Sequence, residues 1–203
     1  MNRCAFFADG FNIYHSLDAL PSYYKYKWLN LAKLAKTFIA SSSEITSIFY
    51  FTTYITWDQR KLARHQIYVR ALQSEGVQPV FGEFRRVDRV CKVCHRQYQT
   101  FEEKQTDVNI AIKLFETAVT DLWDTAIIIS GDSDLIPALK AVKATFPTKK
   151  VGIIIPIARR AEELKQAADF HMKIKEKHLM SCQFEDMVII DKNTKLTRPI
   201  TWK

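Results

Sequence analysis

Short, unbroken apolar runs alternate along this chain with segments of helical periodicity, and this alternation limits the fold more than any other feature. The run in "TAIIIS" (residues 125–130) is typical of a strand that is buried on both faces. Residues 59–74 instead space Leu62, Ile67 and Leu72 among polar residues, as an amphipathic helix does. Strands and helices in alternation predict an α/β fold with a mostly parallel central sheet and helices on both of its faces.

The predicted elements fill most of the chain. Strand-like runs cover residues 3–9, 47–55, 77–84, 125–130 and 150–155, and helix-like segments cover 29–39, 59–74, 106–122, 134–145 and 160–168. Residues 85–105 interrupt the alternation and predict an inserted hairpin or loop. We expect one domain over residues 1–180 that includes this insertion, with residues 181–203 as a C-terminal extension packed on it.

Composition excludes several classes of protein. Of the 203 residues, 47% are hydrophobic and 26% are charged, which is the profile of a globular rather than a disordered chain. The apolar runs are far too short to cross a bilayer, so no membrane is expected as a partner. The first apolar run meets Asp9 too early for a signal peptide, and four cysteines without an export signal predict a cytoplasmic protein.

The net charge of +8 is concentrated near the C-terminus. Residues 140–203 hold 14 Lys and Arg against 7 Asp and Glu. A basic flank of this kind suits a polyanion as partner, and it equally suits a role in solubility alone.

Carboxylates follow the predicted strands at the edge of the sheet where sites of open α/β folds collect. Asp9 ends the first strand and Asp132 follows the fourth, each beside a glycine, while Asp107 and Asp134 stand at helix starts. Taken alone, Asp107 or Asp134 could be a helix N-cap. Taken together, the carboxylates repel one another unless a cation neutralises them, and all-oxygen ligands select Mg²⁺ or Mn²⁺. We therefore expect a metal site that suits hydrolysis of a phosphodiester.

Three segments resemble a known family in sequence, order and spacing. They are "FFADGFNIYHSL" (6–17), "EEKQTDVNIAIKL" (102–114) and "IIISGDSDLIPALKAVK" (127–143). They resemble the NYN domain in its bacterial LabA-like branch, and the resemblance runs from about Arg3 to His178. NYN domains belong to the PIN-like nucleases, which have a Rossmann-like three-layer fold with acidic strand ends that bind Mg²⁺ or Mn²⁺. The resemblance implies a metal-dependent ribonuclease.

Matched by position, the resemblance implies two groups of site residues. The catalytic and metal-binding group is Asp9, Asp107, Asp132 and Asp134, and the substrate-binding group is Asn12, Lys104, Arg159 and Arg160. Asn12 matches the asparagine of the family's "DGxN" motif. Lys104 would contact phosphate or balance the carboxylates, unless it is only a solvated charge. The two arginines would bind the RNA backbone, unless they only begin a helix.

Other interpretations stay open beside the nuclease. The main alternative is an RNA-binding or regulatory module with the same fold and weak or no cleavage, although four intact aspartates favour the enzyme. DNA is not excluded as a substrate, and a homodimer is plausible from related domains. Cys91 and Cys94 in "CKVCH" form half of a zinc ligand set, without a second pair. We favour a structural role for them at the tip of the insertion over zinc, which would need sharing across a dimer.

Overall fold

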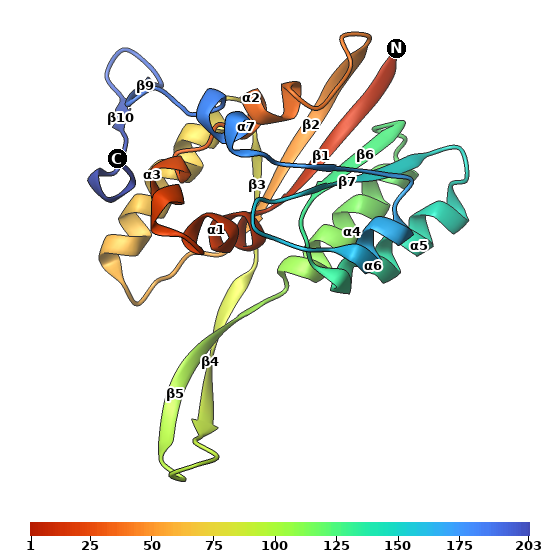
Figure 1. Ribbon diagram of the computed structural model, residues 1–203. Coiled ribbons are helices and arrows are strands. Elements are labelled where there is room, and N and C mark those ends of the chain that lie inside the picture. Colours follow the sequence, from red (N-terminus) through yellow and green to blue (C-terminus); the bar gives the residue numbers. More distant parts are fainter.

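Six parallel strands form the middle layer of the protein. In the computed structural model, which describes all 203 residues, they pair in the order β3-β2-β1-β6-β7-β8 (Figure 1). Their bounds are β1 Asn2–Asp9, β2 Ser43–Thr52, β3 Gln78–Phe81, β6 Thr125–Ile129, β7 Lys150–Ile155 and β8 Phe170–Lys173. Every neighbouring pair is parallel. The predicted α/β fold with a mostly parallel central sheet is confirmed.

Helices cover both faces of the sheet and complete a three-layer sandwich. One face carries α1 Gly10–Asp18, α2 Leu31–Lys36, α3 Gln59–Ser74 and α7 Glu176–Ser181, and the other carries α4 Thr106–Val119, α5 Ile136–Thr145 and α6 Glu162–Ala167 (Figure 1). Helix α3 has the predicted bounds, because the Asp58 carboxylate accepts hydrogen bonds from the first free N–H groups. Helices α1 and α7 and strand β8 are additional to the predicted elements. No helix combines the length and the apolar character needed to cross a membrane.

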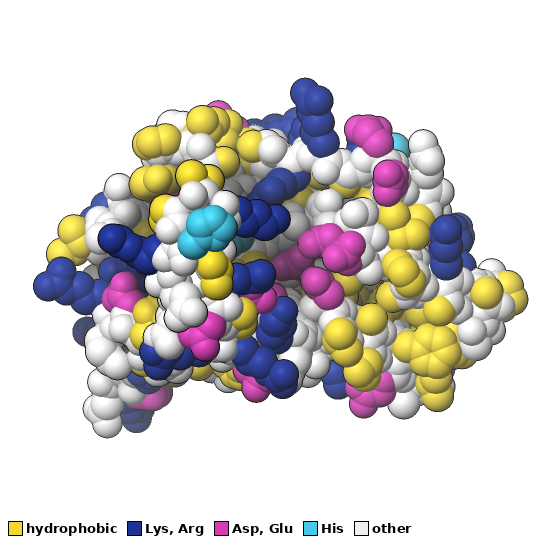
Figure 2. Space-filling view, turned by 90° about the horizontal axis from the view of Figure 1, so that it is seen from below, with side chains coloured by type: hydrophobic (Ala, Val, Ile, Leu, Met, Phe, Trp, Pro, Cys, Tyr) yellow, Lys and Arg dark blue, Asp and Glu magenta, His cyan; other side chains and the backbone are white.

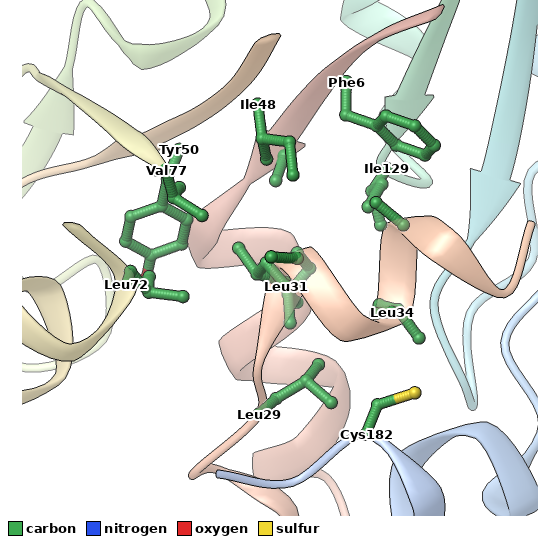
Figure 3. Close-up of a cluster of buried hydrophobic side chains, with 14 of the residues drawn as sticks. Phe6, Leu29, Leu31, Leu34, Ile48, Tyr50, Leu72, Val77, Ile129 and Cys182 are labelled. Carbon is green, nitrogen blue, oxygen red and sulfur yellow. The ribbon is translucent and has the colours of Figure 1, made fainter. Parts of the chain in front are cut away.

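The core consists of two layers, one on each face of the sheet. Along β1, Phe6 and Ala8 face the layer formed with α1, α2, α3 and α7, while Ala5 and Phe7 face the layer formed with α4, α5 and α6. Figure 3 shows Phe6 and its neighbours on the sheet pointing toward the side chains of α2. Each large side chain buried in this way contributes about 1.5–3 kcal/mol of hydrophobic stabilisation. The central strands are apolar on both faces because both faces are covered.

The predicted strand over residues 77–84 is wrong in one respect, because it breaks at Gly82. A Cβ at this position would lie 2.7 Å from the Lys104 carbonyl oxygen and 2.9 Å from Thr53 Oγ1. The close approach of the backbones therefore requires glycine. Beyond the break, β4 Glu83–Val90 pairs antiparallel with β5 Gln97–Lys104, and this hairpin projects away from the sandwich (Figure 1).

Three predicted helices begin two residues later than expected, among them α6, which starts at Glu162 rather than residue 160. Helix α2 starts at Leu31 rather than residue 29, because Asn30 Oδ1 accepts a hydrogen bond from the Lys33 N–H at 2.9 Å and caps the helix. The segment predicted from residue 134 opens with a 3-10 turn, Ser133–Leu135, before α5 begins.

The C-terminal residues pack on the α3 side of the sandwich. Strands β9 Met187–Ile189 and β10 Lys195–Thr197 pair antiparallel, and a 3-10 turn over Ile200–Trp202 follows. The Trp202 ring lies 6.3 Å from the Trp28 ring, between centroids, and both side chains are buried. The tail thus contributes to the core of that layer.

Candidate active site

Acidic side chains from three separate segments meet at the carboxyl end of the sheet. The chain leaves β1 for β2 on one side and later places β6 on the other side, so a topological switch point lies between β1 and β6. Asp9 is the last residue of β1, Asp132 follows β6, and Asp107 stands in the first turn of α4. Figure 2 shows this end of the molecule, where acidic side chains gather in a central hollow with Lys and Arg beside them.

Asp9 is the most deeply buried member of this cluster, with 3% of its surface exposed. Its Oδ1 accepts a hydrogen bond from the Asn12 N–H at 2.9 Å, and its Oδ2 accepts one from Ser130 Oγ at 2.8 Å. Burial nevertheless raises the pKa of Asp9 to about 6, and the negative charges of Asp132 and Glu103 add to the rise. The carboxylate is thus held in place without a compensating positive charge.

Tight packing around the strand end fixes this geometry. A Cβ on Gly10 would lie 2.6 Å from the Phe51 carbonyl oxygen, so only glycine lets α1 start so close to β2. Asn12 Oδ1 accepts a hydrogen bond from the Gly131 N–H at 3.0 Å, which ties α1 to the loop after β6. Asn12, predicted to bind substrate, therefore has a positioning role at this edge.

The loop after β6 orients its own two aspartates. The Asp132 N–H donates to Ser130 Oγ at 3.1 Å, and Asp132 Oδ1 accepts a hydrogen bond from the Asp134 N–H at 3.0 Å. Asp132 is therefore the N-cap of the 3-10 turn, and the interpretation of Asp134 as an N-cap is wrong. The Asp134 side chain is exposed at the rim of the site.

Asp107 reaches the same edge from the end of the hairpin. The N-cap of α4 is Gln105, which has φ +77° and makes no side-chain capping bond, so Asp107 is not the cap. Burial raises the pKa of Asp107 to about 6, and the charges of Asp9, Asp132 and further carboxylates add to the rise. The charges of Asp132 and Glu103 act on both Asp9 and Asp107, so these carboxylates share one electrostatic environment.

Two site residues were missed at the sequence level, Ser130 and Glu103. Ser130 is fully buried and links the Asp9 carboxylate to the Asp132 backbone. Glu103 accepts hydrogen bonds from the Thr106 N–H and hydroxyl, and its charge contributes to the raised pKa values of Asp9 and Asp107. Both residues could have been found from the sequence by their position, since Ser130 lies shortly before Asp132 and Glu103 lies shortly before Asp107.

The three cationic residues predicted to bind substrate differ in exposure and in the residues they contact. Lys104 is exposed and forms an ion pair with Glu102 at 3.0 Å, so it does not neutralise the aspartates. Arg159 lies against Gly131, since a Cβ there would be 3.3 Å from Arg159 Cβ, and its Nε is buried without a hydrogen-bond partner. Arg160 is exposed next to it. None of the four predicted aspartates forms an ion pair with any cation of the chain.

The donor set fits a hard divalent cation. It consists of carboxylate oxygens that are partly withdrawn from water, repel one another and lack a positive partner. In the present side-chain orientations, no three His, Cys, Asp or Glu side chains form a group that could hold an ion. Direct binding by three ligands would therefore require side-chain rotation; Asp134 is exposed and Asp107 is half-buried.

A cavity of about 420 Å³ opens beside the acidic cluster. Gly10 and Glu103 form the wall nearest to the cluster, and the remaining lining is largely aromatic and includes three cations. The aromatic side chains include Phe11, Tyr14 and Trp57, and the cations include Lys61 and Arg64. The site therefore combines an acidic edge with an adjacent pocket lined by aromatic and cationic side chains.

Known proteins resemble this chain in both structure and sequence. The crystal structure of a Vibrio parahaemolyticus protein of unknown function is similar, with a TM-score of 0.58 and 17% identity over 86% of this chain and 94% of that chain. At this identity the likeness shows the fold alone. The 6-hydroxy-3-succinoylpyridine 3-monooxygenase HspA of Pseudomonas putida is 27% identical over 191 residues, covering 76% of this chain. The match spans only 59% of the length of HspA.

A family model gives the broadest match. The model of the NYN domain matches residues 3–175 and includes all of the aspartates at the carboxyl edge of the sheet. Because the match covers most of the sequence, the chain belongs to the NYN domain family, whose members are generally nuclease-like domains with a PIN-like fold.

Proposed function

We propose that this protein is a metal-dependent ribonuclease of the LabA-like branch of the NYN family. One observation carries the proposal: Asp9, Asp107 and Asp132 converge from three segments, and no cation of the chain forms an ion pair with them, while burial and the charge of Asp132 raise the pKa values of Asp9 and Asp107. Uncompensated, partly buried carboxylates destabilise a fold, and such perturbed groups concentrate at functional sites.

Each residue of the edge has a role in this proposal. Asp9, Asp107 and Asp132 would hold Mg²⁺ or Mn²⁺, and Asp134 would complete or orient that ligand set. A divalent ion bound there supplies the positive charge that activates water and stabilises the leaving oxygen of a phosphodiester. Ser130 keeps the Asp9 carboxylate in one orientation, and Asn12 keeps the β6 loop against α1.

RNA is the substrate that suits the surroundings of the edge. The half-buried Arg159 lies beside Gly131, and together with the exposed Arg160 and Lys104 it would add positive charge for the RNA backbone. In the adjacent cavity, Trp57 and Tyr14 offer aromatic surfaces on which an unpaired base can stack. A single strand suits this arrangement better than a duplex, whose bases already stack on one another.

The relative HspA provides a second candidate, hydroxylation of a small aromatic acid, which would take one oxygen atom from O₂ and two electrons from a separate reductant. The cavity favours this candidate too, because aromatic walls and the cations Lys61 and Arg64 suit an aromatic ring with a carboxylate. Binding can be measured directly, since Trp57 lines the cavity. A change in tryptophan fluorescence on addition of 6-hydroxy-3-succinoylpyridine, lost in Arg64→Met, would support this function.

The decisive test of the ribonuclease uses Asp132→Asn. Asparagine keeps the Oδ1 atom that caps the 3-10 turn, so the variant should fold like the wild type. We expect the wild type to cleave labelled single-stranded RNA with Mn²⁺ and not with EDTA, and the variant to lose at least about 100-fold in rate. Glu75→Gln is the matched control, since it removes an exposed carboxylate far from this edge.

The outcomes separate the candidate functions. Full metal-dependent cleavage by Asp132→Asn would overturn the assignment of the site. RNA binding by the wild type without any cleavage would instead support the regulatory module.

A further inference from the structure

The tip of the β4–β5 hairpin carries two cysteines that the proposed function does not use. The hairpin projects away from the sandwich (Figure 1). Cys94 is exposed and Cys91 is half-buried, and both are free thiols. Neither belongs to a core layer, and Val93 between them is 90% exposed. The tip therefore has no apolar interior for the cysteines to support, and their favoured structural role lacks a physical basis.

A single closed turn connects the two cysteines. The Cys91 N–H donates to the Arg96 carbonyl at 2.9 Å, and the His95 N–H donates to the Cys91 carbonyl at 2.9 Å. His95 adopts φ +54°, which closes the turn. Backbone hydrogen bonds thus hold Cys91 and Cys94 within one closed turn at the exposed tip.

Two thiolates from one tip are half of a closed zinc site. Structural zinc takes four ligands in a tetrahedron, and four cysteines are a common set. No third His, Cys, Asp or Glu of this chain joins the pair, and His95 directly follows Cys94, which is an unsuitable spacing for the same ion. The missing two ligands must therefore come from another molecule.

We propose that Cys91 and Cys94 of two copies of this chain bind one Zn²⁺ between the two hairpin tips. A two-fold axis through the ion would present the same pair of sulfurs from each copy, which completes the tetrahedron. Four S–H groups lose their protons to solvent and four Zn–S bonds form, with no change in oxidation state.

The charge of the turn favours a second copy of this chain as the source of the other two zinc ligands. Four thiolates and one Zn²⁺ leave a net charge of −2 at the junction. Lys92 and Arg96 lie within this turn and form no ion pair in the single chain. Without the ion these like charges keep two tips apart, and with it they surround an anionic centre. Association should therefore depend on zinc.

The test uses the full chain, reduced and freed of metal. On titration with Zn²⁺ we expect one ion per two chains beyond any zinc that the double variant Cys91→Ser/Cys94→Ser binds, and a doubling of the mass measured by light scattering, both reversed by EDTA. The double variant Cys91→Ser/Cys94→Ser should bind no zinc at the tip and remain a single chain. Val93→Ser, a change at the exposed residue between them, is the matched control and should behave like the wild type.

Co²⁺ in place of zinc reports the ligands directly. Four sulfurs give strong sulfur-to-cobalt charge-transfer absorption and tetrahedral d–d bands, which the double serine variant should lack. One zinc per monomeric chain, zinc binding unchanged in the double variant, or a dimer that persists without zinc would each overturn the proposal. Asp132→Asn should retain zinc-dependent pairing, so the result is independent of the ribonuclease proposal.

Discussion

The two ends of the central sheet use aspartate in opposite ways. At the amino end, Asp124 accepts hydrogen bonds from the Arg3 guanidinium at 2.7 Å and from the Arg3 N–H at 2.8 Å, and these bonds lower its pKa to about 2. At the carboxyl end, burial and neighbouring carboxylates raise the pKa values of Asp9 and Asp107 to about 6. The residue type is the same at both ends, but its surroundings shift the aspartate pKa in opposite directions.

Pairing explains the difference. Asp121 and Asp169 near the amino end also have cations, Lys149 Nζ at 2.6 Å and Lys143 Nζ at 2.7 Å. The cluster at the carboxyl end has none, although Lys and Arg supply 30 of the 203 residues. Carboxylates of the first kind join strands and helices, whereas the second kind have no ion-pair partner within the chain. The contrast therefore marks the aspartates at the carboxyl end as candidate functional residues without reference to any relative.

The largest effect that we expect is a loss of RNA cleavage, and it is tested by one variant from each end of the sheet. Asp9→Asn should lower RNA cleavage by at least about 100-fold, because the amide cannot supply a charged ligand. The fold should persist, since the amide can still bond to the Asn12 N–H and to Ser130 Oγ. Rates with Mn²⁺ and circular dichroism spectra check both expectations.

Asp169→Asn is the control from the other end of the sheet. It weakens the ion pair with Lys143 and leaves the carboxyl edge untouched. It should keep the wild-type cleavage rate and lower only the melting temperature. Equal loss of activity in both variants would show that the two ends do not differ in function.

Much of this contrast follows from local sequence. Five of the six sheet strands come from apolar runs, and Asp9 and Asp132 are recognisable because each ends such a run beside a glycine. Strand ends of a parallel sheet share an edge, so their convergence could be predicted. Strand β8 could not, because its four residues, "FHMK", are too few and too polar to form a clear run.

The pairing at the amino end depends on distant residues. Arg3 and Asp124 are 121 positions apart, and only the β1–β6 register brings them together. The role of Ser130 likewise requires the adjacent β1 end, since its hydroxyl donates to Asp9. Local sequence thus indicates where a carboxylate stands, and tertiary structure determines whether it is neutralised.

A smaller effect concerns the stability of the metal-free protein. The folded pKa of Asp107, about 6, lies above its ordinary value of 3.8, so its destabilisation is absent below about pH 4 and grows as pH rises toward 6. Asp107→Asn should therefore stabilise the protein at pH 7.5 by about 1 kcal/mol after allowance for solvent screening, or roughly 2–4 °C in melting temperature. Thermal melts in EDTA at pH 4 and pH 7.5 measure this difference.

Adding Mn²⁺ provides the control for that prediction. The ion should stabilise the wild type more than Asp107→Asn at pH 7.5, because it neutralises the same repulsion. A variant that gains equally at both pH values, or that responds to Mn²⁺ like the wild type, would contradict the assignment of Asp107.

The smallest effect has the opposite sign and belongs to Asp124. Its folded pKa of about 2 lies below the ordinary 3.8, so its stabilisation is present above about pH 4 and is lost as pH falls through 2. Asp124→Asn should cost less than about 1 kcal/mol at pH 7, because the side chain is 42% exposed and screened by solvent. Urea unfolding at pH 7 and pH 2 should show the gap between wild type and variant closing in acid. A gap that stays constant would mean that Arg3 holds Asp124 by geometry rather than by charge, and the electrostatic contrast between the two ends would then rest on the carboxyl end alone.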